Sequence, residues 1–143
     1  MKTNIIATLD KAVGTVAYTG YTAGAKKAAS KSNHAAAVKY IAAEDQKCNI
    51  GESTAMGGAL DPCEGRTGTS VIVAAEIALA DFKNPYSTSN AAVRDSSVAH
   101  AAAGDMGYVN LEAADDTITV TTCYQNDCAA ATDDVTNTIE VGE

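Results

Sequence analysis

The pattern of hydrophobic and polar positions divides the chain into a helical first third and a strand-rich last third. Residues 3–47 contain no proline, and small or apolar residues recur there at helical spacing. This pattern predicts one continuous helix of up to about 45 residues, which at 1.5 Å per residue spans about 65 Å. In its second half, a stripe expected to face a core comprises Ala35, Val38, Ile41 and Ala42.

Such a helix is longer than a head built from the rest of a 143-residue chain can cover. We therefore expect residues 1–30 to project and residues 31–143 to form one globular head. Glycines inside the projecting half are typical of close helix–helix packing. Local melting or fraying of this part of the helix is the alternative. The predicted assembly positions are Leu9, Val13, Val16, Gly20, Tyr21 and Gly24.

The middle of the chain reads as an irregular loop followed by a second, short helix. Residues 48–68 form the loop, and Thr69 or Ser70 can cap a helix over 71–83. Its apolar face comprises Ile72, Ala75, Ala78, Leu79 and Phe82, and Asn84-Pro85 is expected to end it. Residues 84–106 are too weakly patterned to assign.

The last third alternates with a period of two residues, which predicts strands. Three segments show the alternation: 108–112, 117–122 and 135–141. Residues 113–116 are short enough to join the first two as a hairpin. The predicted fold class is therefore α+β, with a long N-terminal helix packed on a small antiparallel sheet.

Four cysteines allow three disulfide connectivities. We favour the sequential pairing Cys48–Cys63 and Cys123–Cys128, because turn-forming residues lie inside both segments. Chain-entropy arguments give about 3 kcal/mol of stabilisation for the longer loop and about 2 kcal/mol for the shorter. Disulfides indicate an oxidising compartment. The alternative to two disulfides is four reduced, buried thiols.

Composition and charge exclude several classes of function. The chain is rich in alanine, has no Trp and one Phe, and carries a net charge of −8. Nucleic-acid binding through phosphate neutralisation needs a basic face, so none is expected. No stretch approaches the roughly 18 apolar residues of a membrane span, and no signal peptide is visible at the start.

Candidate catalytic groups are few. Ser53 lies in a near match to the motif Gly-x-Ser-x-Gly, but the motif needs a strand before the serine and a helix after it. His34 is expected to be solvated and His100 to be an ordinary loop or helix residue, each without a triad. The acidic pairs 115–116 and 133–134 are expected to be solvated turns rather than calcium ligands. We predict no enzyme, cofactor or metal site.

Two segments of the first helix give the chain a family likeness. Residues 12–27, Ala-Val-Gly-Thr-Val-Ala-Tyr-Thr-Gly-Tyr-Thr-Ala-Gly-Ala-Lys-Lys, and the run 29–44 closing on Lys47-Cys48-Asn49 resemble the spine helix of bacterial type IV pilins. The run 29–49 is most similar to pilins of marine bacteria. Cys123 and Cys128, followed by a strand, resemble the disulfide-bounded region of pilins. The likeness covers residues from about 12 to the end.

The resemblance implies a structural function. Type IV pilins polymerise into thin surface filaments that serve adhesion, motility or DNA uptake. The expected partners are other copies of the chain and a pilus assembly machinery, and the expected location is the bacterial surface, reached through the inner membrane and periplasm. The alternatives are a pseudopilin or minor pilin of a secretion system, a secreted monomeric binding domain stapled by disulfides, and, more remotely, a hydrolase built on Ser53.

The start of the chain departs from the pilin pattern. Pilins begin with Phe or Met and about 20 apolar residues that include one glutamate. Here residues 1–11 are polar and carry Asp10 and Lys11. We therefore expect contact with a membrane only through an apolar N-terminal segment that this sequence lacks.

Overall fold

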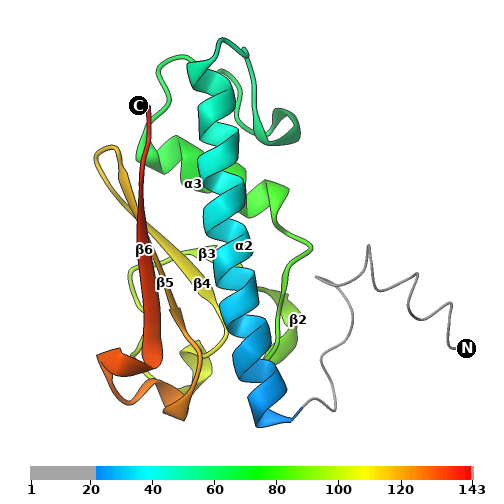
Figure 1. The fold of residues 1–143 in the computed structure, drawn as a ribbon, viewed down its shortest axis with the longest axis vertical. Helices are drawn as coiled ribbons and strands as arrows, with labels where there is room; N and C mark the ends of the chain where they lie inside the picture. The colour runs from blue at the N-terminus through cyan, green and yellow to red at the C-terminus, as the bar shows by residue number, and fades with distance from the viewer. Residues whose placement is uncertain (1–21, 143) are drawn as a thin grey trace, which may run out of the picture.

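The computed structural model describes residues 22–142, which form an α+β head with one long helix laid across a sheet (Figure 1). Both helices, α2 and α3, pack against the β4–β5 region of the sheet. The helices and strands are α2 (Ala23–Asn49), α3 (Gly68–Ala78), β1 (Lys83–Asn84), β2 (Ser87–Ala91), β3 (Val93–Asp95), β4 (Val109–Ala114), β5 (Thr117–Cys123) and β6 (Asp134–Glu140). Four short 3₁₀ helices, at Met56–Gly58, Ala103–Asp105, Asn126–Cys128 and Ala131–Asp133, lie in the connections.

The long helix starts later than the sequence pattern predicts. Thr22 has an extended backbone, and its hydroxyl oxygen accepts a hydrogen bond from the Ala25 N–H at 3.1 Å. This is an N-cap, which satisfies one of the amides that a helix start leaves without a partner. The expectation of one uninterrupted helix over 3–47 is therefore wrong, because the helix begins after Thr22. Helix α2 has 27 residues and is about 40 Å long.

The buried face of α2 also differs from the expected stripe. Ile41 is buried, but Ala35 is exposed, and Val38 and Ala42 are half-buried. The buried positions are mainly polar: Ser30, Asn33, His34, Ala37, Ile41, Glu44 and Asp45. Hydrogen bonds to the rest of the head offset the free-energy cost of burying these polar groups. Because the buried side chains are mainly polar, the spacing of apolar residues could not identify the buried face of α2.

The short helix α3 begins and ends earlier than expected. Thr67, rather than Thr69 or Ser70, is the N-cap, and it exchanges reciprocal hydrogen bonds with Ser70. The helix ends at Ala78, so Asn84-Pro85 does not terminate it. Most of the predicted apolar face is correct: Ile72, Ala75 and Leu79 are buried, whereas Ala78 and Phe82 are half-buried against the core.

The sheet has four strands in the order β3-β4-β5-β6. The predicted antiparallel strands are present as β4, β5 and β6, and Ala114 pairs with Thr117 across a two-residue turn. The expectation of a purely antiparallel sheet is wrong, because β3 pairs with β4 in parallel. The unassigned region 84–106 supplies β3 and part of a separate two-stranded sheet, β1–β2.

The hydrophobic core lies between the helices and one face of the sheet. Because side chains alternate along a strand, Leu111, Val120 and Asn137 share the face that α2 and α3 cover. The opposite face carries threonines, including Thr119 and Thr138, which are direct cross-strand neighbours. One face of the sheet is thus packed and the other is polar.

Candidate functional site

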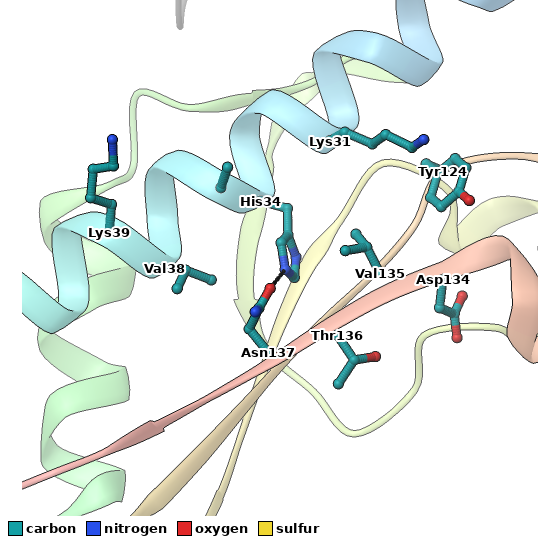
Figure 2. A pocket seen from close by; sticks show the side chains of 10 residues that line it. Lys31, His34, Val38, Lys39, Tyr124, Asp134, Val135, Thr136 and Asn137 are labelled. Carbon is teal, nitrogen blue, oxygen red and sulfur yellow. Dashed lines mark hydrogen bonds between the residues drawn. The ribbon is translucent and has the colours of Figure 1, made fainter.

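The most distinctive polar group of the head is a buried histidine that joins α2 to the sheet. His34 is 2% exposed, with Nδ1 2.9 Å from Thr122 Oγ1 and Nε2 2.8 Å from Asn137 Oδ1 (Figure 2). An amide oxygen only accepts, so Nε2 carries the hydrogen, and the neutral Nδ1 accepts from the Thr122 hydroxyl. The expectation that His34 is solvated is wrong, because its position on α2 faces β5 and β6.

Burial controls the protonation of this imidazole. Loss of hydration disfavours the charged form and lowers the pKa of His34, although the hydrogen bond to Asn137 acts in the opposite direction. The neutral imidazole can satisfy both of its contacts. His34 therefore positions α2 as an uncharged link at neutral pH.

Beside this link, α2 and β6 form the walls of a groove of about 810 Å³. Val38 and Val135 supply apolar surface. Lys31 extends from α2 toward Tyr124, and Lys39 projects from α2 on the side away from β6 (Figure 2). The Lys31 ammonium lies over the Tyr124 ring, 4.2 Å from its centroid. Lys39 has no ion-pair partner among residues 22–142. The groove thus combines apolar side chains with two lysines on its α2 wall, and its β6 wall also includes Asp134.

A second cluster ties the C-terminal end of α2 to the end of β6. Asp45 is 1% exposed; its carboxylate accepts from Arg66 Nε at 2.5 Å and from the Gly142 N–H at 3.2 Å. The neighbouring Glu44 accepts from the Met56 N–H and forms an ion pair with Lys47 at 2.8 Å. Burial would raise the pKa of Glu44, but these two partners lower it overall. The cluster fixes the loop 50–67 against the helix.

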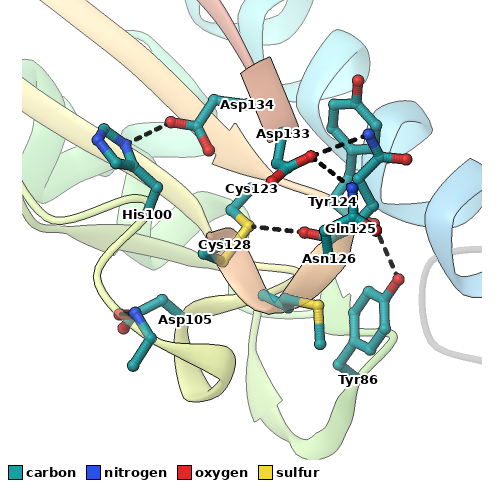
Figure 3. The surroundings of a disulfide bond; sticks show 12 residues. Tyr86, His100, Asp105, Cys123, Tyr124, Gln125, Asn126, Cys128, Asp133 and Asp134 are labelled. Carbon is teal, nitrogen blue, oxygen red and sulfur yellow. Dashed lines mark hydrogen bonds and ion pairs between the residues drawn. A yellow bond between two sulfur atoms is a disulfide. The ribbon is translucent and has the colours of Figure 1, made fainter. Parts of the chain in front are cut away.

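Both disulfides have the sequential pairing expected from the sequence. Cys48–Cys63, with Cα atoms 5.3 Å apart, closes the loop after α2. Cys123–Cys128, with Cα atoms 5.7 Å apart, closes the turn between β5 and β6 (Figure 3). Cys63, Cys123 and Cys128 are each at most 4% exposed, so these bonds belong to the packed head.

The turn closed by Cys123–Cys128 is organised by one carboxylate. Asp133 accepts hydrogen bonds from the side chains of Gln125 and Asn126 and from the Ala130 N–H (Figure 3). Burial would raise the pKa of Asp133, but these donors lower it overall. Asp133 is 3% exposed and the Asp134 side chain, at the start of β6, is 5% exposed, so the expectation of solvated turn residues is wrong for this pair. Asp115 and Asp116 are exposed and form the β4–β5 turn, as predicted.

The candidate catalytic residues are not brought together. Ser53 is exposed in a loop that follows a helix rather than a strand, so the context of its motif differs from that of a nucleophile elbow. His100 is half-exposed, and its Nδ1 is hydrogen-bonded at 2.6 Å to Asp134, whose side chain is 5% exposed. In the described part of the chain, no three His, Cys, Asp or Glu side chains lie together in a metal-binding arrangement.

The predicted assembly positions fall mostly outside the described residues. Leu9, Val13, Val16, Gly20 and Tyr21 precede Thr22, and Gly24 lies in the first turn of α2. Sequence reasoning missed the α2–β6 groove and the His34 link. The available signal was the polar residues Ser30, Asn33 and His34 on α2, whose spacing of three and four residues marks one helix face.

No family model, no curated protein and no solved structure matches this chain. None of the helices within residues 22–142 is long and apolar enough to cross a membrane.

Proposed function

We propose that the chain is a structural subunit of an extracellular type IV pilus filament. The observation that carries the proposal is the order of elements: a long helix on a sheet, then a loop, a short helix and strands closed by a disulfide-bounded turn. This order agrees with the pilin resemblance of residues 12–49 and of the Cys123–Cys128 region. Two disulfides also favour an oxidising, extracellular or periplasmic environment.

The outer face of α2 offers a surface for assembly. Ser32, Ala36 and Ala43 are exposed on the side of the helix turned away from the sheet. Small side chains let helices approach one another closely, and head-to-tail contacts between identical subunits produce open helical filaments. In this account the outer face of α2 points toward the filament interior, and the polar face of the sheet points outward.

The test is expression in a bacterium that has a type IV pilus system but lacks its own major pilin. The full chain is fused to an apolar N-terminal segment that carries a cleavable leader peptide. Filaments are sheared from the cell surface, and the sheared fraction is tested for the chain. We expect the chain in the sheared fraction, and the Ala36→Glu variant should be lost from it while both disulfides still form. A full-length, disulfide-bonded chain that never reaches the sheared fraction would contradict the proposal.

A secreted monomeric binding domain is the second candidate. The observation that favours it is the lysine-bearing groove between α2 and β6, whose β6 wall is left free by assembly through the outer face of α2. The same experiment separates the two functions, since a binding domain would be released as a monomer and Ala36→Glu would have no effect on its release.

A further inference from the structure

Strand β6 is an open edge of the four-stranded sheet. Among residues 22–142 it pairs with β5 on one side only, over all seven of its residues. The strand contains no proline and no lysine, two common devices that protect edges from further pairing. Thr136, Asn137 and Thr138 at its centre are exposed.

The register fixes which backbone groups face outward. Tyr124 N donates to Asp133 O and Val141 N donates to Asp116 O, one at each end of the β5–β6 ladder. Hydrogen-bonded pairs alternate in an antiparallel ladder, so the odd-numbered residues of β6 bond to β5. The N–H and C=O groups of Thr136 and Thr138 therefore point away from β5, and they have no partner in the part of the chain that the structure describes.

The groove lies along this free edge. α2 and β6 run side by side in the same direction, because His34 bonds to Asn137 and, further along both elements, Asp45 bonds to Gly142 (Figures 1 and 2). A strand added at about 4.8 Å from β6 would thus place alternate side chains against Ala35 and Val38. The free edge specifies an extended backbone, and the helix wall specifies apolar side chains on one face.

The lysines specify the charge of the added strand. Residues 23–43 of α2 carry four lysines and no carboxylate. Lys31 and Lys39 are eight residues apart, about 12 Å along a helix, which is close to the roughly 14 Å between residues i and i+4 of a strand. Acidic side chains four residues apart, with an apolar residue midway between them, would match this wall.

A second copy of β6 fits poorly. Antiparallel pairing of two β6 strands about Asn137 places Asp134 opposite Glu140, and like charges directly opposite each other are destabilising. The other edge strand, β3, has only three residues. A second copy therefore lacks a suitable described strand to pair with β6.

We propose that the α2–β6 groove binds an acidic, extended peptide of the pattern Glu-x-Val-x-Glu, which joins the sheet beside β6. Its backbone pairs with Thr136 and Thr138, its central apolar side chain contacts Val38, and its carboxylates approach Lys31 and Lys39. The inference does not depend on filament assembly, because the peptide pairs with the edge of β6, which is not part of the outer face of α2. The groove and that outer face share Ala35 and Lys39 on the helix.

The test mixes the full chain with the capped peptide Thr-Glu-Thr-Val-Thr-Glu-Thr. Fluorescence anisotropy measures the affinity, and NMR measures the exchange of backbone amide hydrogens. We expect the amide hydrogens of Thr136 and Thr138 to exchange more slowly when the peptide is bound. Lys39→Glu should weaken binding about five-fold, because an attractive pair becomes a repulsive one. Thr138→Pro should abolish binding and keep the fold, since its N–H faces away from β5 and edge strands tolerate proline.

Lys83→Glu is the matched control: it makes the same charge change outside the groove and should leave the affinity unchanged. Equal effects of Lys39→Glu and Lys83→Glu would overturn the proposal, as would binding that survives Thr138→Pro. Equal affinity for the peptide with lysines in place of glutamates would also contradict it. Displacement of the peptide by an oligothymidylate would contradict it too. So would a homodimer in which the amide hydrogens of Thr136 and Thr138 exchange slowly without any peptide.

Discussion

His34 Nε2 lies 2.8 Å from Asn137 Oδ1, so a buried imidazole on the helix holds the edge strand of the sheet. The contact links two elements that are 103 residues apart in the chain. It places a histidine, whose pKa is lowered by burial, at the junction on which the α2–β6 groove depends. The protonation of this one side chain is therefore coupled to the stability of the head.

The first prediction concerns pH. Burial lowers the pKa of folded His34 below its ordinary value of 6.5, whereas the unfolded chain takes up the proton near 6.5. The unfolded state then binds more protons in this range, so the free energy of unfolding should fall as the pH drops below about 6.5 and level off below the folded pKa. Denaturant unfolding between pH 8 and 5 measures this change.

The control for this effect is His34→Gln, which removes the titrating ring, compared with His100→Gln. We expect the decrease between pH 7 and 5 to be reduced in the first variant and retained in the second. Glu44 and Asp133, whose pKa values are lowered, add a further loss only at more acidic pH. An identical pH profile for wild type and His34→Gln would rule out the coupling.

The second prediction concerns the buried ion pair at the other end of α2. Removing Arg66 leaves the Asp45 carboxylate, 1% exposed, without its cation, and such a loss typically costs about 3–5 kcal/mol. Arg66→Ala should therefore strongly lower the denaturation midpoint. Lys47→Ala, which breaks the more exposed pair with Glu44, should have a much smaller effect. Similar losses in the two variants would contradict this account.

The third prediction concerns Gly68 at the start of α3. A Cβ atom there would lie 2.5 Å from the Asp115 carbonyl oxygen and 3.1 Å from Ala113 Cβ. Neither neighbour is the end of a flexible side chain, so Gly68→Ala should cost about 1–3 kcal/mol through overpacking. Gly104→Ala, whose Cβ would meet nothing within 4 Å, should be neutral or slightly stabilising. Thermal melts of both variants check the ranking.

The fourth prediction ranks the two disulfides. The Cys48–Cys63 loop spans 15 residues and the Cys123–Cys128 loop spans 5. Closing the longer loop restricts the unfolded chain more, which gives about 3 kcal/mol against about 2 kcal/mol. Double alanine variants should lose stability in that order, and the unreduced protein should be four hydrogen atoms lighter than the reduced one. Free thiols in the native protein would contradict the presence of both disulfides in the head.

The parts of the fold that follow from sequence are those with a clear apolar period. Strands β4, β5 and β6 alternate Val, Ile or Leu with polar residues, so their faces and the turn at Asp115-Asp116 were predictable. The same reasoning found the buried Ile72 and Leu79 of α3. In these segments burial and side-chain hydrophobicity coincide, which is the condition that pattern arguments require.

The parts that were missed depend on polar burial and on long-range contacts. The buried side of α2 includes Asn33, His34 and Asp45, whose partners lie 21 to 103 residues away in the chain. Strand β2 has the sequence Ser-Thr-Ser-Asn-Ala and offers no apolar alternation. The helix start at Thr22 depends on one capping hydroxyl inside a segment of continuous helical pattern. The candidate groove could not be foreseen because it lies between two such elements.

Electron microscopy of the sheared surface fraction, from cells expressing the full chain behind an apolar segment, tests the assembly account most directly. The account predicts thin filaments, with α2 turned inward so that Ala36 and Ala43 contact neighbouring subunits. It predicts that Ala36→Glu abolishes these filaments and that Lys31→Glu, which changes a residue of the groove outside this outer face, does not. Dispersed single heads with both disulfides intact, or filaments unaffected by Ala36→Glu, would contradict it.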